Sequence, residues 1–236
     1  MTARERIIAA LEHRESDFVP YVIPIDPQVA KRLDDHYGGP QWRGRIQGFF
    51  CTVSVAWGRE ELPDGTWRDY FGVVWRDADG PGAWHSVDVP LKEPSLAGYE
   101  FPQLLPDDEL ERMRQTLAGH EDRYRYANIG MTFFERAWAL RGMENILTDF
   151  LLHPQFAHEL FDRLMHMHLE LIDRLATLPL DAIRFGDDFG QQRGLIMGTR
   201  IWREFLKPRL AQMYQRVHEL GMHVWIHSCG DNSPIM

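Results

Sequence analysis

Apolar and polar residues follow two different periods along the chain, and segments with each period alternate. Apolar residues that recur every three or four positions mark the expected helices. Short, nearly continuous apolar runs bounded by glycine, proline or aspartate mark the expected strands. We expect helices at residues 2–11, 27–37, 107–119, 133–142, 143–153, 154–178 and 200–220. We expect main-sheet strands at residues 18–26, 49–57, 123–131, 181–188 and 222–230.

Several local signals fix where helices begin and end. Thr2 and Glu5 have the spacing of a capping box. Pro27 is suited to the first turn of the next helix, and the two glycines after Tyr37 are suited to ending it. Pro208 lies inside the last expected helix, where a proline predicts a kink.

The alternation of about five strands with helices predicts parallel βαβ units. Two architectures satisfy this pattern, the doubly wound open sheet and the (β/α)₈ barrel. The first expected strand is followed by "PIDPQV", which lacks the glycine-rich phosphate loop of a dinucleotide-binding sheet. The sequence therefore favours a single α/β domain over residues 1–236, built as a (β/α)₈ barrel.

Residues 41–106 interrupt this alternation and carry five of the eight tryptophans. Turn signals at Asp64-Gly65 and Pro81-Gly82 predict a β-hairpin between about Glu60 and Trp84. We interpret this tryptophan-rich excursion as an addition to the barrel. Its aromatic side chains suit a small core or the wall of a pocket, and we favour the core.

Composition narrows the classes of partner. The 236 residues are 44% hydrophobic and 26% charged, which is enough apolar surface for a core. The net charge of −9 opposes binding to nucleic acid or to an anionic membrane. Two distant cysteines and the charged start "MTARERI" favour a reducing, cytoplasmic compartment. No apolar run reaches the roughly 20 residues of a membrane span.

Residues after the carboxyl ends of barrel strands are the candidates for chemistry. The last expected strand ends in His227-Ser228-Cys229-Gly230, and the period of two places His227 and Cys229 on one face. An imidazole and a thiolate on one face suit zinc or a similar ion. The alternative is that Cys229 is a small buried apolar residue and His227 a hydrogen-bonded core residue.

Carboxylates form the second group of candidates. Asp187 and Asp188 end the fourth expected strand, where they are suited to binding a cation, orienting a substrate or exchanging a proton, and we treat both as catalytic candidates. The alternative is that an aspartate there only caps a turn. Asp26 and Glu135 are candidate substrate contacts, although an ion pair of Glu135 or Arg136 within its own helix is the favoured reading.

Four segments resemble the uroporphyrinogen decarboxylase superfamily. They are "TARERIIAALEHRESDFVP", "FFERAWALRGMENILTDFLLHP", "RFGDDFGQQRGLIMGTRIWREFLKPRL" and "GMHVWIHSCGD". The resemblance implies a (β/α)₈ barrel. It also implies one of two activities, namely porphyrinogen decarboxylation or zinc-dependent methyl transfer with methylcobamide or a corrinoid protein.

Two motifs separate these branches. The decarboxylases carry an arginine-containing R-Q-A-G-R type stretch after the first strand, where this chain has Asp26, and an F-S-D-I type segment on the second strand, which "FFCTVSVAW" lacks. The methyltransferase branch has an H-x-C-G motif that supplies two zinc ligands, and residues 227–230 match it. The resemblance places a third ligand, a cysteine, in the last part of the barrel, outside this chain, with Asp187 or Asp188 as a poorer substitute.

The resemblance therefore predicts zinc-dependent methyl transfer, with a corrinoid partner protein and a thiol, methoxy or methylamine-type substrate. His227 and Cys229 would hold the metal. The chain is expected to be a barrel truncated after about five βα units, or one completed by a homodimer or another polypeptide. The alternatives are decarboxylation of a porphyrinogen and a non-catalytic partial barrel that acts as a binding module.

Overall fold

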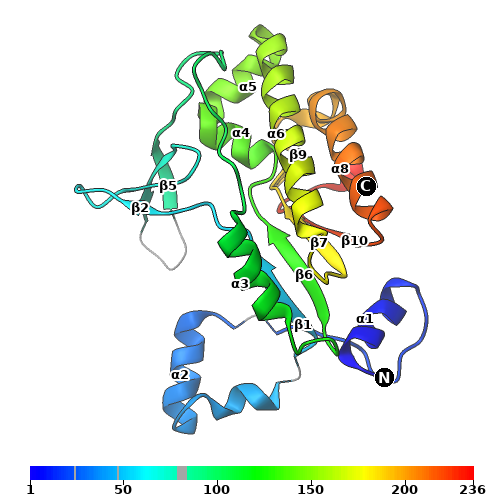
Figure 1. Ribbon diagram of the computed structural model, residues 1–236. Helices are drawn as coiled ribbons and strands as arrows, with labels where there is room; N and C mark the ends of the chain where they lie inside the picture. Colours follow the sequence, from blue (N-terminus) through cyan, green and yellow to red (C-terminus); the bar gives the residue numbers. More distant parts are fainter. Residues whose placement is uncertain (24, 47, 79–83) are drawn as a thin grey trace.

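The computed structural model describes the chain except residues 24, 47 and 79–83. Its main sheet has four strands, β1 (Phe50–Ser54), β6 (Tyr124–Ile129), β7 (Ala182–Gly186) and β10 (His223–His227). They lie in the order β1-β6-β7-β10, and every neighbouring pair is parallel. The strands follow their order in the chain, with helices between them (Figure 1). This is the order of consecutive units of a (β/α) barrel and not that of a doubly wound sheet, as the sequence predicts.

The helices largely occupy the expected segments. They are α1 (Ala3–Leu11), α2 (Pro27–Tyr37), α3 (Asp107–Leu117), α4 (Phe134–Arg141), α5 (Met143–Leu152), α6 (Pro154–Leu175), α7 (Gly198–Ile201) and α8 (Lys207–Glu219). Short 3₁₀ turns lie at Pro40–Arg45 and Ser233–Ile235. The capping box of Thr2 and Glu5 is present at α1, and Gly38 ends α2 in the left-handed conformation with φ of 69°.

The last long helix is divided by a π-helical turn at Trp202–Leu206. The expected kink therefore lies before Pro208, and Pro208 itself sits in the first turn of α8. A proline there lacks the N–H that would bond to the carbonyl of Glu204, so a wider turn is tolerated just upstream.

The tryptophan-rich excursion contains a separate antiparallel sheet rather than one hairpin. Its strands are β2 (Glu60–Glu61), β3 (Trp67–Arg68), β4 (Val74–Asp77) and β5 (Trp84–Asp88), in that order across the sheet. We call it the β2–β5 sheet. Trp67 and Trp75 are buried and stack on each other, so the expected aromatic core is confirmed. The predicted turn at Pro81-Gly82 lies outside the described residues.

The prediction of a strand at residues 18–26 is wrong for the described part of that segment. Residues 18–23 have no strand pairing, and Val19 is 78% exposed. Phe18 and Tyr21 instead place their rings against Phe49, at centroid distances of 6.3 and 5.3 Å. Pro20 has no N–H to donate to a ladder, which weakens the segment as a strand. The main sheet consequently has four described strands, not five.

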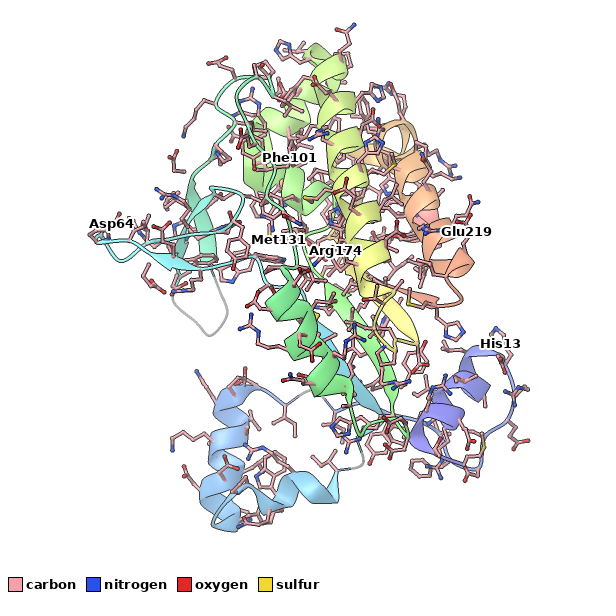
Figure 2. All side chains as sticks on the ribbon, viewed as in Figure 1. His13, Asp64, Phe101, Met131, Arg174 and Glu219 are labelled. Carbon is pink, nitrogen blue, oxygen red and sulfur yellow. The ribbon has the colours of Figure 1, made fainter. Side chains whose placement is uncertain are left out.

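The two faces of the main sheet differ. On β7, Phe185 packs against Tyr214 of α8, while Arg184 points to the opposite face and lies over Trp225 of β10. Helices α3 and α8 contact the sheet at β1 and β10, and α6 packs against α8 (Figure 1). The side chains between sheet and helices form a continuous core, with Met131, just beyond β6, near its centre (Figure 2). This core fixes the strand ends that carry the candidate residues.

Candidate metal centre

The site is built at the carboxyl ends of β7 and β10. Gly186 pairs with His227 at the end of the ladder, and the N–H of Asp187 donates to the carbonyl of His227 at 3.0 Å. The two loops that follow these strands therefore start side by side. This brings Asp188 of one loop next to Cys229 of the other.

Three potential ligands meet here, namely Asp188, His227 and Cys229, whose ligand atoms all lie within 4.8 Å of one another. His227 Nε2 is 3.5 Å from Cys229 Sγ and 3.7 Å from Asp188 Oδ1. Donor atoms around a tetrahedral zinc ion lie roughly 3.3–3.7 Å apart, given zinc bonds of 2.0–2.3 Å. The three groups therefore fit a zinc ion with small adjustments, and they leave a fourth position for another ligand.

His227 and Cys229 are both exposed. The alternative in which they are buried structural residues is therefore wrong. The pKa of Cys229 is raised by a hydrogen bond with Asp188, by desolvation, and by the negative charges of Asp188 and Glu135. A bound cation would offset this negative field and favour the thiolate.

Asp187 has a different environment from its neighbour. Its buried carboxylate accepts the backbone N–H groups of Phe133, Phe134 and Glu135 at 2.9, 2.9 and 2.8 Å. Burial raises the pKa of Asp187 to about 7, and the three N–H donors act in the opposite direction. The carboxylate thus caps the start of α4, and Asp188 is the aspartate that lies with His227 and Cys229.

Glu135 lies at the start of α4, beside the two aspartates. Burial raises its pKa to about 8, with further contributions from the charges of Asp187 and Asp188. Arg136 does not pair within its helix as expected, because its Nη1 donates to the buried carboxylate of Asp69 at 2.8 Å. Because its pKa is raised, the half-buried Glu135 can hold a proton near the three potential ligands.

The structure does not bring Asp26 to this site. Asp26 is the N-cap of α2, where its side chain accepts the N–H of Gln28 at 2.8 Å. In Figure 1, α2 lies toward the opposite end of the main sheet from the loop after β10. Asp26 is misplaced in the prediction because residues 18–23 do not form the strand that would have carried it to the barrel mouth.

Sequence reasoning missed two residues that hold the loop after β10. Ser228 and Asn232 form hydrogen bonds across and within the two loops of the site. They belong to the segment that carries His227 and Cys229. The available signal was Ser228, a short polar residue that lies between the two candidate ligands in the sequence. Its hydrogen-bond partner Phe189 belongs to a separate part of the chain, so the sequence alone did not show this contact.

Comparisons with known proteins support the fold, and the family match covers the part of the chain that carries the candidate site. Residues 134–236 match the family model described as Uroporphyrinogen decarboxylase (URO-D). A solved structure, a methyltransferase from Methanosarcina mazei, matches with a TM-score of 0.64 and 16% sequence identity, over 100% of this chain and 72% of that chain. No curated protein matches the chain. In the described part of the chain, no helix is both long and apolar enough to span a membrane.

The matched family region contains Asp187, Asp188, His227 and Cys229. The resemblance to the uroporphyrinogen decarboxylase superfamily is therefore confirmed over the C-terminal part of the chain. The structural match shows that the chain shares the fold of part of that methyltransferase.

Proposed function

We propose that this chain carries a zinc-dependent methyl-transfer centre that works with a corrinoid protein. The observation that carries the proposal is the convergence of Asp188, His227 and Cys229, with donor atoms within 4.8 Å. One oxygen, one nitrogen and one sulfur donor suit zinc, and catalytic zinc sites keep about three protein ligands and one open position. The solved methyltransferase with the same fold supports this choice of reaction.

Zinc held by these residues would supply a Lewis acid that activates an acceptor thiol or polarises a methoxy or methylamine-type donor. Asp188 and His227 are 38% and 48% exposed, so a substrate atom can reach the space between them. Glu135 can retain a proton near neutral pH because burial and neighbouring carboxylates raise its pKa to about 8. It is therefore suited to delivering or receiving a proton at the substrate.

A competitive zinc titration tests the centre directly. We expect His227→Ala, Cys229→Ala and Asp188→Ala each to weaken zinc binding at least about tenfold, which corresponds to about 1.4 kcal/mol. Cys51→Ala is the matched control, because Cys51 is the other thiol and lies on β1. Affinity unchanged in both His227→Ala and Cys229→Ala would remove the proposed centre.

Turnover assays decide between the reactions. Zinc-loaded protein is incubated with methylcobalamin and a simple thiol, and loss of the cobalt-bound methyl group is followed by absorbance. Porphyrinogen decarboxylation is the second candidate because the family model carries that description. We expect methyl transfer that depends on zinc and little decarboxylation of uroporphyrinogen. Efficient decarboxylation would favour the second candidate, and no turnover of either substrate would favour a binding module.

A further inference from the structure

The loops after β7 and β10 are joined by a second set of contacts beyond the three potential ligands. The N–H of Gly190 donates to the carbonyl of Cys229 at 3.2 Å, and the N–H of Asp231 donates to the carbonyl of Gln191 at 2.8 Å. The N–H of Cys229 donates to Asp188 Oδ1 at 2.8 Å. These bonds continue the pairing of the two chain segments past the last residue of β10.

The backbones approach so closely that side chains cannot fit between them. A Cβ on Gly190 would lie 2.6 Å from the carbonyl oxygen of Cys229, and one on Gly230 would lie 2.2 Å from the carbonyl carbon of Gly190. Gly230 also has a φ of 80°, a conformation that favours glycine. The two loops therefore meet at a glycine pair.

Asn232 and Ser228 connect the loops through their side chains. Asn232 Nδ2 donates to the carbonyls of Ser228, Cys229 and Gly230 at 3.1, 3.1 and 3.3 Å. Asn232 Oδ1 accepts from the Ser228 hydroxyl at 3.2 Å. The Ser228 oxygen in turn accepts the N–H of Phe189, in the other loop, at 2.9 Å. We call Asn232, Ser228 and the Phe189 N–H the Asn232–Ser228 clamp.

We infer that Asn232 and Ser228 are positioning residues that hold Cys229 Sγ next to Asp188 and His227, ready to bind the metal. Cys229 is exposed and lies beyond the end of β10, so the strand ladder alone does not fix it. A loop that had to become ordered on binding would lose affinity through the entropy of ordering. The clamp provides this order beforehand, as hydrogen-bonded partners of metal ligands do elsewhere.

The expected effect on zinc affinity rests on the proposed metal centre, but the clamp itself can be measured without metal. Hydrogen exchange on the metal-free protein reports the clamp itself. We expect Ser228→Ala to speed exchange at the Phe189 amide, and Asn232→Ala to speed exchange at the amides of Gly190 and Asp231. Ser228→Thr retains a hydroxyl and should restore protection. Unchanged exchange in Ser228→Ala and Asn232→Ala would overturn the clamp.

The same variants are then titrated with zinc alone. We expect Asn232→Ala and Ser228→Ala to weaken binding about tenfold, within the range seen when partners of metal ligands are removed, and Ser228→Thr to recover most of the loss. With cobalt(II) as a spectroscopic substitute, both alanine variants should show a weaker thiolate-to-metal absorption. Ser233→Ala is the control, because the Ser233 hydroxyl bonds to Asp231 within its own turn.

The two proposals fail in different ways. If zinc binding depends on Cys229 but is unchanged in Asn232→Ala and Ser228→Ala, the positioning role is refuted and the metal centre stands. If Cys229→Ala alone leaves zinc binding unchanged, the positioning role is refuted, and if His227→Ala also leaves it unchanged, the metal centre is refuted as well.

Discussion

Asp187 and Asp188 are adjacent, but their carboxylates have different surroundings. Asp187 is buried and accepts three N–H groups from the start of α4, whereas the Asp188 side chain is 38% exposed. Unpaired buried donors cost roughly 1–3 kcal/mol each. We therefore expect Asp187→Ala to lower the free energy of unfolding by about 3 kcal/mol, and Asp188→Ala by less than about 1 kcal/mol. Urea denaturation measures both, and equal losses would contradict this difference.

The sequence predicted part of this arrangement. The strand period placed His227 and Cys229 on one face, and the parallel alternation placed Asp188 at a neighbouring strand end. The partners of Asp187 were out of reach, because the N–H groups that it accepts lie more than 50 positions earlier in the chain. A local pattern identifies which residues end a strand, but not which helix terminus packs there.

At the scale of elements, the contact between α6 and the segment before α4 contains a buried histidine. His168 of α6 stacks on Phe133 at a centroid distance of 5.8 Å, and its Nδ1 is 2.7 Å from the carbonyl of Leu164. Burial lowers the pKa of His168 to about 4, while the Leu164 carbonyl acts in the opposite direction. The unfolded chain therefore binds a proton at His168 at a higher pH than the folded protein does.

The consequence is a loss of stability in acid. The contribution of His168 is fully present above its unfolded pKa of about 6.5 and is lost as the pH falls towards the folded value of about 4. Between about pH 7 and about pH 5 the loss is roughly 2 kcal/mol. His168→Asn keeps a donor for Leu164 and removes the titration. We expect the stability of this variant to fall less over that range, as measured by denaturation at each pH.

His166→Asn is the matched control, because His166 is an exposed histidine on the same helix. Glu135 and Asp187 have raised pKa values and give the opposite slope, but they are present in all three proteins and cancel in the comparison. An identical pH dependence in His168→Asn and in the native protein would show that His168 does not cause the slope.

Element prediction succeeded for the long amphipathic helix and the later parallel strands, and it failed for the first expected strand. The 22 residues of α6 and the three later parallel strands β6, β7 and β10 lie where the apolar pattern places them. Residues 18–23 have the composition of a strand, and β1 is an edge strand of the described sheet. Pro20 cannot donate to a ladder, however, and the segment instead packs the rings of Phe18 and Tyr21 against Phe49. The π-helical turn before Pro208 was likewise anticipated only as a kink.

At the scale of the whole molecule, a buried ion pair connects the β2–β5 sheet to the barrel. Arg136 of α4 and Asp69 of the excursion are 1% and 0% exposed at their side chains. Asp69 also accepts the N–H groups of Phe71 and Val73 at 3.0 Å each and the indole N–H of Trp75 at 3.1 Å. The Arg136 guanidinium lies 3.9 Å from the centroid of the Phe71 ring. One carboxylate thus organises the loop before β4 and ties it to α4.

Removing the arginine should therefore affect both parts of the molecule. Arg136→Met leaves the Asp69 charge buried without its cation, which is expected to cost about 3–5 kcal/mol of unfolding free energy. Adding Asp69→Asn to the same variant removes the buried negative charge. Part of the lost stability should then return, because no uncompensated charge is left in the core. Arg59→Met is the control, since Arg59 and Asp77 form an exposed pair with side chains 45% and 56% accessible, and its loss should cost much less than the loss of Arg136. Denaturation measures the energies, and hydrogen exchange at the Phe71 and Val73 amides reports whether the β2–β5 sheet loosens from α4. Similar losses in Arg136→Met and Arg59→Met, with unchanged exchange, would mean that this pair does not hold the sheet to the barrel.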